Sequence, residues 1–89
     1  MKKHVLDARL LEPPEPFMHA SAILRALKPS EFFYMIHRRV PYPLIDLSNN
    51  LNIEHRLIQT EEQDCVLVFF FAEDLDQLKE APLIRDLLR

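Results

Sequence analysis

The chain contains no glycine in its 89 residues. Glycine lets a backbone approach a phosphate group closely, so a dinucleotide-binding fingerprint and a P-loop are both excluded. Backbone positions with positive φ must then fall to asparagine or aspartate, which tolerate that conformation better than other residues. We expect a helix to end in this way at the cluster Asn49, Asn50 and Asn52.

The composition is that of one small soluble domain. Hydrophobic residues make up 48% and charged residues 28% of the chain, which is normal for a globular protein. A net charge of -3 at pH 7 gives no attraction for phosphate backbones or anionic lipid, so neither nucleic acid nor a membrane is an expected partner. One cysteine, no export signal and no long apolar run together predict a cytoplasmic protein.

Hydrophobic periodicity predicts short elements in the order β-α-β-α-β-β. Helices are expected near 14–28 and 43–51, and strands near 4–8, 32–36, 53–60 and 65–71. The expected fold class is α+β, a two-layer sandwich in which two helices cover one face of a four-stranded mixed sheet. This domain would span residues 1–72.

Residues 73–89 form a separate pattern, interpreted as a C-terminal helical extension. Leu75, Leu78, Leu83, Ile84, Leu87 and Leu88 recur among charged residues around Pro82, which predicts a helix ending near Ala81 or two short helices. Strand alternation turns Phe70 away from Phe69 and Phe71, so an aromatic side chain faces away from the helices. Either the tail covers this open face, or a partner or second copy of the chain does.

The stretch LLEPPEP, residues 10–16, holds three prolines and two glutamates. Proline in a first helical turn loses only donors that are unpaired there anyway, and it presets φ. The same prolines remove donors that would hold an anion, while Glu12 and Glu15 add negative charge. The stretch is therefore interpreted as a rigid lead into a helix, without an anion site at the helix start.

A family resemblance begins in the same region. Residues 6–16, LDARLLEPPEP, resemble the opening of the TusA-like, or SirA-like, sulfur-carrier superfamily, in which leucine-aspartate and glycine-leucine pairs precede cysteine-proline-x-proline. With KPSE at 28–31 and PYPL at 41–44, the chain is more similar to a cysteine-less branch of this superfamily, whose members are domains of unknown function. The resemblance covers residues 6 to about 71, and Leu10 and Glu12 depart from the residues usual in carriers.

The resemblance places Pro13 at the position of the carrier cysteine, where a helix dipole would stabilise a thiolate or persulfide. Proline has no nucleophile, so the implied protein keeps the carrier scaffold and loses its reaction. We therefore favour a small non-catalytic binding or accessory module with a protein partner. The expected docking residues are Glu12, Pro13, Glu15, Phe17, His37, Arg38, Arg39 and Tyr42.

The run His37-Arg38-Arg39 concentrates positive charge in the sequence. Arginine pairs bidentately with planar anions, so this run is suited to an acidic partner or a carboxylate ligand. The alternative is a solubilising strand edge.

Two other functions stay open. His37 and His55 can meet if the ends of neighbouring strands adjoin, which would suit a weak metal or heme contact in a metal- or redox-linked accessory domain. The resemblance adds to this, because the branch is sometimes found beside hemerythrin-like metal-binding domains. Histidine spacing carries no metal signature, so exposed edge histidines are the alternative and no cofactor is assigned. Cys65 is either an inert core residue or a second-site sulfur carrier in a sulfur-transfer enzyme.

Overall fold

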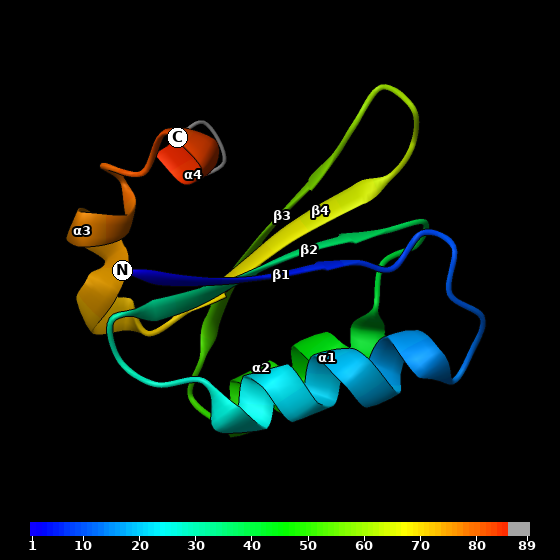
Figure 1. The fold of residues 1–89 in the computed structure, drawn as a ribbon, viewed down its shortest axis with the longest axis horizontal. Helices are drawn as coiled ribbons and strands as arrows, with labels where there is room; N and C mark the ends of the chain where they lie inside the picture. The colour runs from blue at the N-terminus through cyan, green and yellow to red at the C-terminus, as the bar shows by residue number, and fades with distance from the viewer. Residues whose placement is uncertain (86–89) are drawn as a thin grey trace.

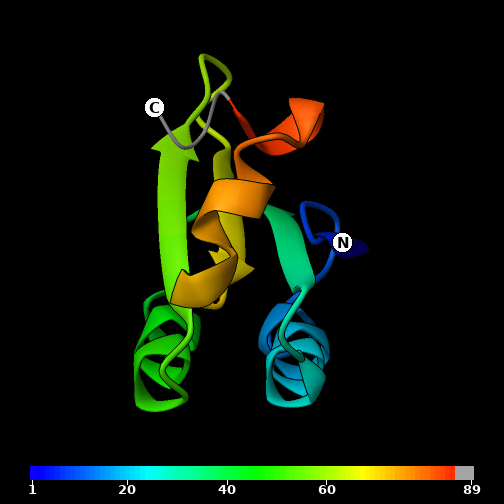
Figure 2. The same cartoon turned by 90° about the vertical axis from the view of Figure 1, so that its left-hand side faces the viewer.

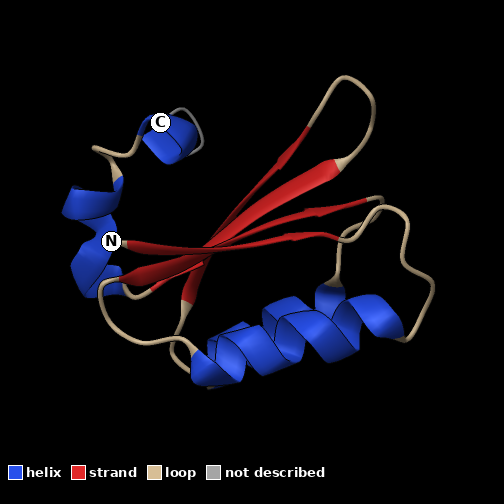
Figure 3. Ribbon diagram, viewed as in Figure 1, coloured by secondary structure: helices blue, strands red, loops and turns tan. Residues whose placement is uncertain are grey.

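The computed structural model describes residues 1–85 and confirms the α+β fold (Figures 1 and 3). The four-stranded sheet has the order β1-β2-β4-β3, with β1 parallel to β2 and the other neighbours antiparallel. The strands are β1 (Lys2–Asp7), β2 (Glu31–His37), β3 (Glu54–Gln59) and β4 (Cys65–Phe70). The helices are α1 (Glu15–Ala26), α2 (Tyr42–Asn50), the 3-10 turn η1 (Ala72–Asp74), α3 (Leu75–Leu78) and α4 (Pro82–Arg85).

Proline starts both of the longer helices, as the sequence predicted. Pro14 precedes the first residue of α1, and Pro16 lies in its first turn. Pro41 and Pro43 occupy the same two places in α2. Each proline occupies a position where the missing N–H would have no helical partner, so the fixed φ favours the helix without the loss of a hydrogen bond.

Helices α1 and α2 lie side by side on one face of the sheet (Figure 2). Their apolar residues pack on alternate residues of the strands, which point toward the helices. Phe33 and Phe69 stack in this core with ring centroids 5.6 Å apart. Ser48 is the buried polar residue of α2, and its hydroxyl donates a 2.7 Å hydrogen bond to the carbonyl of Ile45. The buried members of this first core are Ala8, Ala20, Leu24, Leu27, Phe33, Met35, Leu44, Ile53, Cys65, Leu67 and Phe69.

The tail covers the opposite face of the sheet, and it forms two short helices around Pro82 as predicted (Figures 1 and 2). Leu78 and Ile84 are fully buried against strand residues that point away from α1 and α2. Phe70 lies in this second core and Phe69 in the first, which confirms the predicted alternation. The second core consists of Phe32, Val68, Phe70, Leu78 and Ile84. Leu87, Leu88 and the side chain of Leu83 lie outside the described part of the chain.

Among residues 1–85, three adopt positive φ, and only one of these positions was expected. Asn52, just after α2, has φ of 59°, which confirms the role given to the asparagine cluster. Ser30 and Gln63 have φ of 67° and 65°, so the expectation that asparagine or aspartate takes every such position was wrong. Both lie in tight turns before or between strands, where the turn geometry overrides the local preference.

Within residues 1–85, no helix combines the length and the apolar character needed to cross a bilayer.

Candidate functional site

The loops that follow β1, β2 and β3 gather at one end of the sheet, because these three strands run in the same direction. We call this region the loop end and define it as residues 8–14, 38–41 and 60–64. The loop from β1 leads into α1, the loop from β2 leads into α2, and the third joins β3 to β4 (Figure 1). All residues of the sequence-predicted docking surface lie in these loops or in the strand and helix residues beside them.

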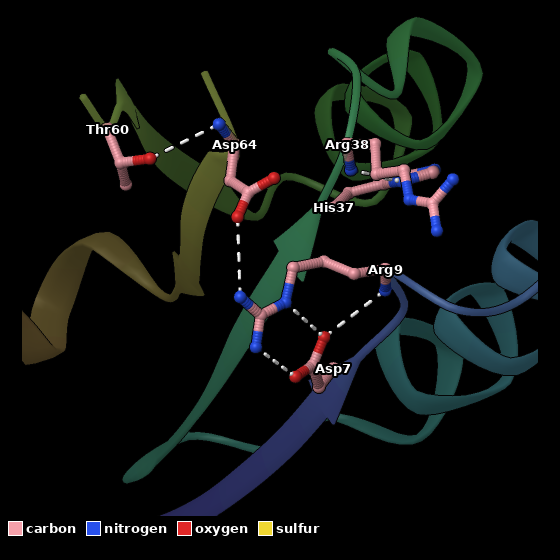
Figure 4. A network of polar contacts seen from close by, with 6 residues as sticks. All are labelled: Asp7, Arg9, His37, Arg38, Thr60 and Asp64. Atoms are coloured by element: carbon pink, nitrogen blue, oxygen red, sulfur yellow. Dashed lines mark hydrogen bonds and ion pairs between the residues drawn. The ribbon is translucent and has the colours of Figure 1, made fainter. Parts of the chain in front are cut away.

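Arg9 connects two of the three loops (Figure 4). Its guanidinium donates to both carboxylate oxygens of Asp7, at 2.9 and 2.6 Å, and to Oδ2 of Asp64 at 3.3 Å. Hydrogen bonding to Arg9 lowers the pKa of Asp7 from 3.8 to about 2. The charge of Arg9 is therefore already balanced within the protein, and this residue acts as a clamp between the first loop and the β3–β4 hairpin.

A small hollow of about 90 Å³ lies beside this clamp. His37 is partly buried in it, and burial, followed by the nearby charges of Arg39 and Arg38, lowers its pKa. The Nδ1 atom of His37 accepts a 2.8 Å hydrogen bond from the backbone N–H of Arg38, which fixes the ring against its own loop. The lining residues are Arg9, Leu11, Glu12, Pro13, His37, Arg38 and Arg39.

A larger open groove of about 560 Å³ shares Arg38 and Arg39 with the hollow and extends to the β3–β4 hairpin. Its other lining residues are Val40, Gln59, Thr60 and Gln63. Arg38 and Arg39 are exposed, and no carboxylate of residues 1–85 lies within ion-pair distance of either one. The two arginines thus stand between two depressions with their charges unpaired by the described chain.

The structure brings five of the eight predicted docking residues together around the hollow: Glu12, Pro13, His37, Arg38 and Arg39. Glu15, Phe17 and Tyr42 line neither depression. Phe17, in the first turn of α1, is 43% exposed. Pro16 takes the buried position one residue earlier, which turns Phe17 outward.

Besides Phe17, two more exposed hydrophobic residues lie in or beside the loop end. Tyr42 at the start of α2 is 68% exposed and Leu10 in the first loop is 87% exposed. Aromatic residues and arginine are enriched at the energetically important positions of protein interfaces. Exposed apolar side chains beside the exposed Arg38 and Arg39 therefore give this end of the molecule the composition of a docking surface.

Arg9 and Leu11 belong to the site and were missed from the sequence. The position of Arg9 in the sequence could have indicated its role. Arg9 follows the end of β1 and Arg38 follows the end of β2, and the ends of parallel strands lie at the same edge of a sheet. Gln59, Thr60 and Gln63 were missed because the hairpin was interpreted only as a connection.

The register separates His37 from His55. His37 pairs with Cys65, whereas His55 pairs with Phe69, four residues further along β4. Because β4 lies between their strands, the two Cα atoms are roughly 16 Å apart by ordinary strand spacings, too far to share one ion. Among residues 1–85, no group of three or more histidine, cysteine, aspartate or glutamate side chains is placed to hold a metal.

Cys65 is fully buried in the first core, at the start of β4. Burial hides the sulfur from a donor or acceptor molecule, as the core interpretation predicted. A sulfur-transfer reaction at this residue would require β4 to open first.

No protein-family model matches the chain, and no curated protein or solved structure matches it significantly.

Proposed function

We propose that this chain is a small, non-catalytic, cytoplasmic binding module that has the scaffold of a sulfur carrier without the carrier thiol. Its loop end docks a protein partner, with Arg38 and Arg39 as the charged anchor. The observation that carries the proposal is the pair of depressions on either side of these two exposed arginines.

The chemistry at Pro13 supports a binding role over a catalytic one. Pro13 lies just before α1 and lines the hollow, at the position that the family resemblance assigns to the carrier cysteine. A proline ring offers neither a nucleophile nor a backbone donor. Glu12 beside it also opposes the binding of a persulfide or another anion at the start of α1.

The surroundings of Arg38 and Arg39 support a protein partner. Exposed Leu10 and Tyr42 supply apolar area, and the arginines supply directional charge, which together resemble the mixture found in transient protein interfaces. The Arg9 clamp holds the β1–α1 loop against the hairpin. A docking surface held in this way loses little conformational freedom when a partner binds.

The proposal is tested by affinity purification from the native cell, comparing the wild-type chain with the double variant R38Q/R39Q. The variant R25Q serves as the control, because Arg25 is an exposed arginine in the last turn of α1, away from both depressions. We expect one or a few proteins to be retained by the wild type and by R25Q and lost from R38Q/R39Q. An identical set of proteins on all three baits would refute the proposed docking surface.

A further inference from the structure

The groove between Arg38–Arg39 and the β3–β4 hairpin differs in charge from the neighbouring hollow. The hollow is lined by Glu12, which carries a carboxylate, and by Arg9, whose guanidinium is ion-paired with Asp7 and Asp64. Among residues 1–85, the groove is lined by the exposed Arg38 and Arg39, by one apolar residue, and by the amides and hydroxyl of Gln59, Thr60 and Gln63, with no acidic side chain. An anionic group is therefore better accommodated in the groove than in the hollow.

We propose that this groove binds an extended, polar segment of the docked partner and holds a single carboxylate of that segment between Arg38 and Arg39. The proposal rests on the function proposed above and names the chemistry that the loop end recognises. Guanidinium groups bind carboxylates through paired, charge-assisted hydrogen bonds, which provide both geometry and energy. Gln59, Thr60 and Gln63 supply amide and hydroxyl groups for the flanking backbone and polar side chains of the segment.

The shape of the site favours a peptide over a small free anion. The groove runs from the end of β2 across the start of β4 to the end of β3, and its volume of about 560 Å³ far exceeds that of one carboxylate. Three adjacent strand ends span about 10 Å, a path that about three extended residues cover, so a segment of about six residues also extends beyond the groove at its two ends. The lining is more polar than apolar in character, so the groove does not select a hydrophobic anchor.

The charge of the hairpin limits how acidic the segment can be. Glu61 and Glu62 lie in the loop between Thr60 and Gln63, and both are exposed without lining the groove. They repel a run of acidic residues or a polyphosphate backbone that approaches the groove from solvent. A segment with one carboxylate meets less of this repulsion than a segment with several, so the groove selects a partner segment of low negative charge.

The test uses the intact chain and a blocked peptide of about six residues, with one central aspartate among serines and glutamines. Amide and arginine side-chain NMR signals are followed during titration. We expect shifts at Arg38, Arg39, Gln59, Thr60 and Gln63, and binding weaker by about tenfold or more when asparagine replaces the aspartate. R38Q/R39Q should bind both peptides equally weakly, whereas R25Q should behave as the wild type.

Three comparisons complete the test. A polyglutamate peptide should bind more weakly than the single-aspartate peptide, and E61Q/E62Q should remove that difference. Acetate at the same concentration should not reproduce the shifts. Equal binding of the aspartate and asparagine peptides, tighter binding of polyglutamate to the wild type, or equal binding of acetate would each overturn the proposal.

This result separates the two proposals. If the peptides fail while the partner from the native cell still depends on Arg38 and Arg39, the inferred carboxylate recognition is wrong and the docking surface stands. If that dependence is also absent, both are refuted. Circular dichroism of each variant establishes that it is folded, which is expected because both arginines are exposed.

Discussion

The backbone N–H of Ser30 donates a 2.8 Å hydrogen bond to Oδ2 of Asp74, 44 positions later in the chain. Ser30 is in the turn before β2, and Asp74 is a buried carboxylate in the first turn of the tail. The bond attaches the tail to the sheet at a point where the backbone has positive φ. It also satisfies a carboxylate that would otherwise be costly to bury.

Replacement of Asp74 by alanine should lower the free energy of unfolding by about 1 to 3 kcal/mol, because the Ser30 N–H loses a charged acceptor. Urea denaturation followed by circular dichroism measures the change. Asp76→Ala is the control, since Asp76 is an exposed acid two residues later. Equal effects of the two variants would show that the hydrogen bond contributes nothing specific.

The packing of the tail gives a second stability prediction. Leu78 is fully buried in the second core, so Leu78→Ala should cost about 2 to 5 kcal/mol through lost burial and the cavity that remains. Leu10→Ala is the matched substitution at a side chain that is 87% exposed, and it should be nearly neutral. A small effect of Leu78→Ala in thermal or urea unfolding would contradict the second core.

The pKa of His37 reports the charge of the loop end. Burial and the charges of Arg39 and Arg38 lower it from 6.5, so the folded state binds a proton less readily than the unfolded chain. The free energy of unfolding should accordingly decrease as the pH falls from 6.5 through the folded pKa. In R38Q/R39Q the pKa should rise but stay below 6.5, because burial remains.

An NMR titration of the His37 imidazole measures this shift, with R25Q as the variant that should leave it unchanged. Arg9 and Glu12 share the hollow with His37 and are present in every variant. A His37 pKa that does not respond to R38Q/R39Q would place the two arginine charges further from the ring than the structure has them.

The Arg9 clamp should be visible in the titration of Asp7. The pKa of Asp7 is lowered to about 2 by hydrogen bonding to Arg9, so its stabilising contribution is complete above 3.8 and is lost as the pH falls toward 2. Arg9→Gln should return the pKa of Asp7 toward 3.8, as read from carboxyl chemical shifts. Asp64→Asn should leave it low, because the Asp7–Arg9 pair persists.

Cys65 should be protected from thiol reagents in the native protein and react fully in denaturant, because its side chain is completely buried. Ala22→Cys adds a thiol on the exposed side of α1 and provides the positive control. Rapid native labelling of Cys65, detected by intact mass, would reopen sulfur transfer at this residue.

Much of the fold was predictable because its elements carry strong periodic signals. The alternation around Phe69 and Phe70 predicted two buried faces, and the prolines before α1 and α2 predicted where those helices begin. These signals are local. Positive φ at Ser30 and Gln63 was not predictable in the same way, because it follows from the turns that the assembled strands require.

The candidate site was only partly predictable. The run His37-Arg38-Arg39 is visible in the sequence as concentrated charge, whereas Arg9 gains its role from Asp64, 55 positions away. The groove also depends on the β3–β4 hairpin lying beside the residues that follow β2, at the start of β4, and no local pattern encodes this placement. Helical spacing alone does not fix whether Pro16 or Phe17 faces the sheet, and in the structure Pro16 is buried and Phe17 is exposed.

All six residues of β4 are buried: Cys65, Leu67 and Phe69 lie in the first core with the longer helices, and Val68 and Phe70 lie in the second core with the tail. The strand therefore contributes to both cores. Unfolding of one core should disrupt the other, because both depend on β4. The tail residues Leu78 and Ile84 are therefore part of the interior of the domain. We expect denaturation to proceed as one all-or-none transition.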